Sequence, residues 1–210
     1  MKKPLWQPSE KRKEDSLLED FSKFINFKLD KNFKNLWEWS VKNPEKFWSQ
    51  FWDYSKIIGD KGKEVIRDNK IFNQVKFFPD SKLNYTENIL KKKTNDTAIH
   101  FLSETGFEES ITWKDLYEKV CKFSAYLKTL NLQKGDCVAA YVPNKIESIV
   151  SFLACVKNGI IWSSCSPDFG TQGVVDRFKQ IEPKVLITSD HYFYNGKKIN
   201  ILEKVDGILK

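Results

Sequence analysis

Small polar side chains gather between residues 163 and 171, where a strand-like run gives way to a helical one. Exposed backbone NH groups and the positive end of a helix dipole at such a junction favour an anion such as phosphate. The same residues would also suit an ordinary loop in which Thr171 or Asp168 caps the following helix. Both interpretations stay open on these residues alone. The cluster consists of Ser163, Ser164, Ser166, Asp168, Gly170 and Thr171.

A second candidate site lies in the segment Tyr192-Phe-Tyr-Asn-Gly-Lys-Lys198. The dipeptide Asn195-Gly196 favours a tight turn, which would present Lys197 and Lys198 to solvent. A lysine ammonium in such a loop can meet a phosphate as a point charge. The segment would equally serve as a plain hydrophilic turn.

Other residue types that carry chemistry form no recognisable set. His100 and His191 fall in different predicted elements without carboxylates at a useful spacing, so we expect neither a catalytic nor a metal-binding role for them. We find no Ser/His/Asp set, no metal-ligand spacing and no Walker lysine. The spacing of the four cysteines fits neither a zinc site nor a compact disulfide framework, so we expect buried free thiols in a reducing compartment. They are Cys121, Cys137, Cys155 and Cys165.

Composition predicts a globular protein with a general preference for anionic partners. The chain has 210 residues, 40% of them hydrophobic, which is enough for one sizeable domain or a domain with a cap. The net charge of +7 comes mainly from scattered lysines, with short runs only at Lys11–Lys13 and Lys91–Lys93. We find neither a basic face nor a motif typical of nucleic-acid binding, so we expect no nucleic-acid partner. Such charges are most often a merely solvated lysine-rich surface, and binding of an anionic small molecule is the alternative.

The chain carries no signal for a membrane or for secretion. The start, Met1 to Trp6, lacks an apolar segment of the secretory type, and no window approaches 18 apolar residues. We therefore expect a cytoplasmic protein that does not bind membranes.

The elements that position the two candidate sites follow from hydrophobic periodicity. Residues 97–102 and 110–113 predict a hairpin, and apolar steps of three and four predict a helix over about 113–130. Thr112 and Asp115 approximate a capping box at its start. A continuous apolar run over 137–142 then predicts a strand that is buried on both faces.

Strands and helices alternate in the rest of the chain. Pro143-Asn144 opens a helix that Gly159 closes, and strands over 160–165 and 184–188 flank a helix over 171–181. Strands and helices that alternate at such short intervals predict parallel strands joined by right-handed crossovers. The expected fold is a three-layer α/β sandwich, which is incomplete in this sequence. Ligands of such sheets bind beyond the carboxyl ends of the strands, where the 163–171 cluster follows its strand.

The N-terminal region predicts a helical cap. Residues 1 to about 30 suggest a loosely docked arm, and the aromatic-rich stretch over 35–58 predicts two short helices, the second with Pro44 in its first turn and Asn43 as its cap. Its aromatic stripe could line a ligand cage, but packing is the commoner use. We expect the arm and cap to occupy residues 1–92 and the main domain to occupy 93–210.

Several segments together resemble the acetoacetyl-CoA synthetases, which belong to the adenylate-forming superfamily. Gly159-Ile-Ile-Trp-Ser-Ser-Cys-Ser-Pro-Asp-Phe-Gly170 resembles their GxxWSSCSPDFG stretch, and Leu83-Asn-Tyr-Thr-Glu-Asn-Ile-Leu90 resembles their LNYAENLL segment. Thr112-Trp-Lys-Asp-Leu116 and Gly135-Asp-Cys-Val138 are similar to general acyl-CoA synthetase patterns. The region over 35–58 is similar to the N-terminal extension of the acetyl-CoA and acetoacetyl-CoA enzymes.

The resemblance implies an acid:CoA ligase that uses ATP, Mg²⁺ and CoA, with acetoacetate as the acid and a role in ketone body and lipid metabolism. Ser166, Pro167 and Asp168 would then lie along the CoA nucleotide, and Lys197 would meet a CoA phosphate. The family's phosphate loop, Mg²⁺ contacts and catalytic lysine lie downstream and do not occur within 1–210. We therefore expect an N-terminal fragment that is inactive alone, carries no catalytic or metal-binding residue, and has the missing downstream part as a possible partner. The alternatives are a free-standing CoA or nucleotide-binding module and a fragment of another short-chain acyl-CoA synthetase.

Overall fold

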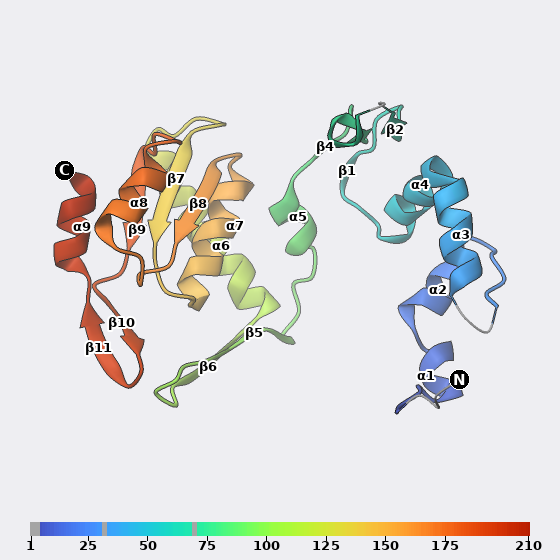
Figure 1. The fold of residues 1–210 in the computed structure, drawn as a ribbon, viewed down its shortest axis with the longest axis horizontal. Helices are drawn as coiled ribbons and strands as arrows, with labels where there is room; N and C mark the ends of the chain where they lie inside the picture. Colours follow the sequence, from blue (N-terminus) through green and yellow to red (C-terminus); the bar gives the residue numbers. More distant parts are fainter. Residues whose placement is uncertain (1–4, 31–32, 69–70) are drawn as a thin grey trace. The chain divides into compact units, whose positions relative to one another are not determined.

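The computed structural model describes residues 5–30, 33–68 and 71–210, and the chain divides into two compact units, Met1–Leu83 and Asn84–Lys210 (Figure 1). The packing boundary thus falls after Leu83. Compact packing and domain identity are different criteria, so the predicted domain boundary after residue 92 stays a prediction. None of the helices within the described ranges is long and apolar enough to cross a membrane.

The first unit contains four helices and two small antiparallel sheets within its described residues. Its elements are α1 (Glu10–Glu14), α2 (Leu17–Phe24), α3 (Lys34–Lys42), α4 (Pro44–Tyr54), β1 (Gly59–Asp60), β2 (Ile66–Arg67), the 3₁₀ turn Phe72–Gln74, β3 (Lys76–Phe77) and β4 (Lys82–Leu83). Strand β1 pairs with β4, and β2 pairs with β3. The two helices expected over 35–58 are therefore confirmed as α3 and α4.

Aromatic rings hold the helices of this unit together. The ring of Phe21 on α2 is buried, and its centroid lies 5.8 Å from Phe47, 5.8 Å from Phe51 and 5.1 Å from Tyr54, all on α4. Edge-on contacts at these distances are favourable because the positive edge of one ring meets the negative face of the next. The aromatic stripe thus packs against neighbouring helices, as the commoner interpretation held.

Asn43 is the N-cap residue of α4, so the predicted cap is confirmed in position but not in its hydrogen bond. Pro44 begins α4 as expected, but the side chain of Asn43 makes no capping hydrogen bond to that helix. Its Nδ2 instead donates to the carbonyl of Trp39 at 3.0 Å, near the end of α3. The same carbonyl also accepts from the backbone NH of Asn43 at 2.9 Å, so the side chain adds a second hydrogen bond at the end of α3.

A parallel sheet forms the centre of the second unit. Strands β7 (Cys137–Tyr141), β8 (Ile161–Cys165) and β9 (Val185–Thr188) lie in the order β8-β7-β9. Helices α6 (Trp113–Thr129) and α7 (Ile146–Lys157) cover one face, and α8 (Thr171–Phe178) and α9 (Leu202–Leu209) cover the other (Figure 1). The predicted three-layer sandwich with a parallel sheet is confirmed.

The middle strand shows why the layers form. Val138 packs into the cluster under α6 and α7, whereas Ala139 and Tyr141 pack into the cluster under α8 and α9. Successive side chains of a strand point to opposite faces, so a run without polar residues requires cover on both. Val138 through Tyr141 are each 0% exposed, as expected of a central strand.

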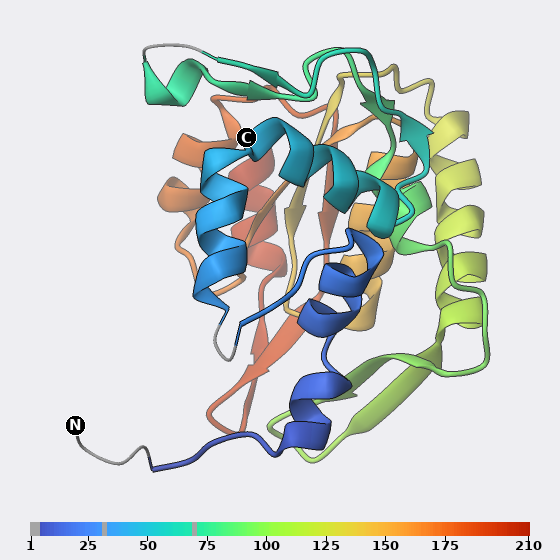
Figure 2. The same ribbon diagram turned by 90° about the vertical axis from the view of Figure 1, so that its right-hand side faces the viewer.

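Two hairpins extend from the sandwich. Strands β5 (Thr97–Leu102) and β6 (Glu108–Thr112) precede α6, and Thr112 and Asp115 form the predicted capping box. Strands β10 (His191–Tyr194) and β11 (Lys197–Asn200) are joined by Asn195-Gly196. The tips of the two hairpins lie side by side at one end of the unit (Figure 2).

The short helix α5 (Tyr85–Ile89) begins the second unit and is bonded to α7. The buried hydroxyl of Thr86 donates to the carbonyl of Leu153 at 2.7 Å. Nδ2 of Asn84 donates to the carbonyl of Val156 at 2.9 Å, while its Oδ1 accepts from the backbone of Glu87. The Leu83–Leu90 segment therefore has a structural role in docking one helix on another.

Candidate functional site

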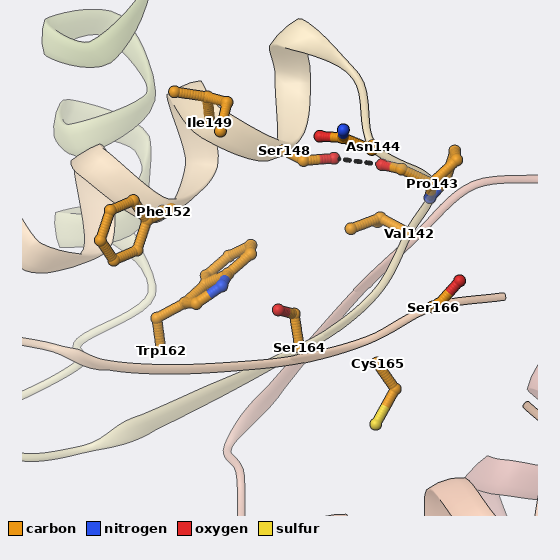
Figure 3. Close-up of a pocket in the computed structure, with 10 residues that line it drawn as sticks. All are labelled: Val142, Pro143, Asn144, Ser148, Ile149, Phe152, Trp162, Ser164, Cys165 and Ser166. Atoms are coloured by element: carbon orange, nitrogen blue, oxygen red, sulfur yellow. Dashed lines mark hydrogen bonds between the residues drawn. The ribbon is translucent and has the colours of Figure 1, made fainter. Parts of the chain in front are cut away.

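A cavity of about 280 Å³ opens beside α7, at the carboxyl ends of β7 and β8 (Figure 3). Ligands of open parallel sheets bind at this edge, which is the edge where the sequence leads us to expect a ligand. The cavity is lined by Val142, Pro143, Asn144, Ser148, Ile149, Phe152, Trp162, Ser164, Cys165 and Ser166.

Most of the cavity wall is apolar. The rings of Phe152 and Trp162 meet at 6.3 Å between centroids, and the side chain of Ser164 lies on the cavity side of β8 (Figure 3). The sulfur of Cys165 points to the opposite side of the strand (Figure 3). Burial raises the pKa of the Cys165 thiol, which keeps it protonated and makes it a poor nucleophile. An apolar wall with a few hydroxyl and amide groups is suited to binding rather than to proton transfer.

The loop after β8 alternates between exposed and buried residues. Ser166 and Asp168 are exposed, whereas Pro167 between them is buried. The hydroxyl of Tyr141 donates to the carbonyls of Pro167 and Phe169, at 2.7 Å each, and the ammonium of Lys204 reaches the Pro167 carbonyl at 3.3 Å. The backbone is thus held from beneath, while two polar side chains face outward.

The helix cap that we considered for this loop is absent. Gly170 is the N-cap residue of α8 and makes no side-chain cap, so neither Asp168 nor Thr171 has the capping role. The guanidinium of Arg177 lies 4.4 Å from the centre of the Phe169 ring and donates to the carbonyl of Gly173. Asp168 therefore keeps its carboxylate available at the surface.

Lys197 lies in a different element, at the start of β11. It is exposed and faces Tyr194 across the hairpin. Within the part of the chain that the structure describes, no hydrogen bond joins Lys197 to the Ser166–Asp168 loop. The turn before it is anchored by Glu104, whose two carboxylate oxygens accept from the backbone of Asn195 at 3.1 Å and of Gly196 at 3.0 Å.

The two histidines have local partners. Nδ1 of His100 lies 2.7 Å from the hydroxyl of Ser110. Nδ1 of His191 lies 2.8 Å from Oδ1 of Asp190, which corrects our expectation that no carboxylate was usefully placed. Contact with His191 lowers the pKa of Asp190. The two residues are adjacent in the sequence, so this contact could have been predicted from the sequence alone.

The cysteines and the acidic residues reveal no further chemistry. The four cysteines are free, as expected, but only Cys155 and Cys165 are buried, whereas Cys121 and Cys137 are half-buried. Burial raises the pKa of Cys155 to about 12. Across 5–30, 33–68 and 71–210, no group of three or more His, Cys, Asp or Glu residues could hold a metal ion.

Sequence reasoning missed two residues of this region, Tyr141 and Glu104. A tyrosine inside an otherwise apolar buried strand was a usable signal for Tyr141, because a buried phenol requires a hydrogen-bond partner. Glu104 carried no such signal, since it is one of many charged residues at exposed turns.

Two family models match this chain. The model described as "AMP-binding enzyme" matches residues 86–209, more than half of the chain, and the model described as "Acetyl-coenzyme A synthetase N-terminus" matches residues 33–89. The two matches together span residues 33–209 and so include parts of both compact units.

Individual relatives agree with the family models. The acetoacetyl-coenzyme A synthetase of Rhizobium meliloti (strain 1021) is 37% identical over 99% of this chain and 32% of its own length. The acetoacetyl-CoA synthetase of Gallus gallus is 39% identical over 85% of this chain and 27% of its own. The solved structure of the acetoacetyl-CoA synthetase from Streptomyces lividans matches 99% of this chain and 33% of its own, with a TM-score of 0.90 and 30% identity. The chain therefore spans about a third of the length of these relatives.

Proposed function

This chain belongs to the AMP-binding enzyme family, and on that premise we propose that it forms the N-terminal part of an ATP-dependent acetoacetate:CoA ligase. The proposed reaction converts acetoacetate, ATP and CoA to acetoacetyl-CoA, AMP and diphosphate. The observation that carries the proposal is similarity along the whole chain to acetoacetyl-CoA synthetases. It includes the Gly159–Gly170 stretch, which contains the Ser166–Asp168 loop.

In this proposal the second unit binds and orients CoA. Lys197 would place its ammonium near a CoA phosphate, which it meets as a point charge. Ser166 would donate or accept a hydrogen bond through its hydroxyl, and the Asp168 carboxylate would accept from an amino or hydroxyl group of the nucleotide. The loop fits such a ligand because both side chains are exposed on a backbone held at Pro167.

We assign ATP and Mg²⁺ to the complete enzyme rather than to residues of this chain. Bound ATP would supply the adenylyl group that activates the carboxylate, and the residues described here would contribute by holding CoA. We further propose a cytoplasmic protein of ketone body and lipid metabolism. The first unit, together with the residues up to about 92, would be the N-terminal extension of the enzyme.

Two alternatives share the same CoA site. The chain could be a free-standing CoA or nucleotide-binding module, or a part of a ligase for another short-chain acid. If the first alternative holds, the chain binds CoA but does not restore activity when it is joined to the rest of a ligase. The second requires a different acid preference, which the residues of this chain do not set.

A chimeric enzyme tests the proposal that this chain is the first third of such a ligase, while the acid preference of the chimera would come from its other two thirds. This chain would replace the matching first third of the Streptomyces lividans enzyme, and pyrophosphate release would be measured with acetoacetate, ATP, Mg²⁺ and CoA. We expect acetoacetate-dependent turnover from the chimera and none from this chain alone or from the remaining two thirds alone. A chimera that melts cooperatively yet gives no turnover above the blank would contradict the proposal, and CoA binding by this chain would then favour the free-standing module.

A further inference from the structure

Tyr141 is the only tyrosine of the described residues that is completely buried, and its hydroxyl lies beneath the loop that follows β8. The ring packs in the cluster between the sheet and helices α8 and α9. Burial, followed by the nearby Tyr192, Asp168 and Cys165, raises the pKa of Tyr141. The phenol therefore stays protonated and able to donate throughout the physiological range.

The acceptors of this hydroxyl are two carbonyls on either side of Asp168. One hydrogen is shared between the carbonyl oxygens of Pro167 and Phe169, with the phenol oxygen 2.7 Å from each. A three-centre bond of this kind restrains two peptide groups, those that follow Pro167 and Phe169, with one peptide group between them. The side chain of Asp168, which projects from between them, takes its direction from the same contact.

The loop has few other contacts to hold it. Within the described part of the chain, its internal backbone bond runs from the NH of Phe169 to the carbonyl of Ser166, at 3.2 Å. Lys204 on α9 reaches the Pro167 carbonyl at the longer distance of 3.3 Å. Tyr141 thus makes the shortest hydrogen bonds to this loop, from the middle strand of the sheet.

We propose that Tyr141 is a positioning residue for coenzyme binding, which holds Ser166 and Asp168 in the geometry that receives the CoA nucleotide. This inference rests on the proposed function. Tyr141 would not touch CoA itself, because its ring and hydroxyl are covered. It would act by removing the freedom of the loop before the ligand arrives, so that binding need not order the loop.

The test is the dissociation constant of CoA for the 210-residue chain, measured by calorimetry for the wild type and for Tyr141→Phe. The substitution removes one oxygen atom and keeps the ring in the core. Loss of a hydrogen bond of this type corresponds to a roughly three- to tenfold change, so we expect the dissociation constant to rise by that factor. Tyr126→Phe, which removes the same atom from an exposed site on α6, is the matched control and should change nothing.

A double-mutant cycle separates positioning from general loss of stability. If Tyr141 acts through the loop, its effect on CoA affinity should nearly disappear when Ser166 and Asp168 are both alanine. The effect should persist undiminished in a Lys197→Ala background, because Lys197 lies in another element. A merely structural role would lower affinity equally in both backgrounds, and that result would overturn the inference.

A second measurement covers the case in which Tyr141→Phe folds poorly. Lys204→Met removes the other donor to the Pro167 carbonyl without altering the core, and should weaken CoA binding by a smaller factor in the same direction. Unchanged CoA affinity in both folded variants would overturn the inference alone. Absence of CoA binding by the wild-type chain would overturn the proposed CoA site and this inference together.

Discussion

The backbone NH of Gly196 donates to a carboxylate oxygen of Glu104 at 3.0 Å, although the two residues are 92 positions apart. The other oxygen accepts from Asn195, so one carboxylate holds the whole turn. Asn195 and Gly196 have positive φ angles of 50° and 72°. A two-residue hairpin turn of type I′ requires positive φ at both of its central residues. The hairpin that carries Lys197 is thereby fixed to the tip of the β5–β6 hairpin.

Replacing Glu104 should release this turn. A hydrogen bond to a charged acceptor is worth about 1.5–3 kcal/mol, so Glu104→Ala should raise the amide exchange rates of Asn195 and Gly196 by roughly tenfold or more. Hydrogen exchange followed by NMR provides the measurement. Glu108→Ala, which removes the same charge from the same hairpin, should leave both rates unchanged. Equal acceleration in the two variants would show that charge, and not the contact, protects the turn.

Lys197→Ala should weaken CoA binding about tenfold, the loss typical of one charge-assisted contact to a phosphate. Binding of 3′-dephospho-CoA should barely change if the 3′-phosphate is the partner. Lys198→Ala is the control, because successive strand residues point to opposite faces and Lys198 lies opposite Phe193 instead of Tyr194. Equal losses in the two variants would indicate general electrostatic attraction.

Thr86→Val should destabilise the second unit by about 1–2 kcal/mol. The substitution preserves volume but removes the buried hydroxyl that donates to Leu153 at 2.7 Å. Thr129 donates to the carbonyl of Tyr126 at the same distance of 2.7 Å but is exposed, so Thr129→Val should cost less than about 0.5 kcal/mol. Urea unfolding of both variants checks the difference, and similar midpoints would refute a special role for Thr86.

Asp136 should contribute to acid sensitivity. The ammonium of Lys184, 2.8 Å away, and the backbone NH of Gln133 lower the pKa of its carboxyl. Its stabilising contribution is therefore complete above the ordinary aspartate pKa of about 3.9 and is lost as the pH falls through the lower, folded value. In Asp136→Asn the melting temperature should be lower at neutral pH and should fall less steeply below about pH 4. Asp206→Asn, at an exposed position of α9, should keep the wild-type slope.

The sequence alone determined the parts of this protein that depend on neighbouring residues. Periodicity identified the strands and helices of the sandwich, Thr112 and Asp115 form the capping box expected of their spacing, and Asn195-Gly196 makes the expected turn. Each of these features depends on residues that are only a few positions apart, and their spacing along the chain restricts the local backbone geometry. The sequence also placed Asn43 correctly at the N-cap position of α4, but its side chain donates to Trp39 on the helix before it and makes no bond to the helix after it.

Only the tertiary structure decided how the candidate site is held. The hydroxyl of Tyr141 meets a carbonyl 26 residues away, and Glu104 meets a turn more than 90 residues away. Such pairs form because β7 lies between β8 and β9 and because two hairpin tips lie at one end of the unit. Strand order and hairpin docking depend on the apolar surface that the whole core buries. They cannot be predicted from the local spacing of residues. Residue types thus indicated where a ligand could bind, whereas packing determined which backbone groups are held there by hydrogen bonds.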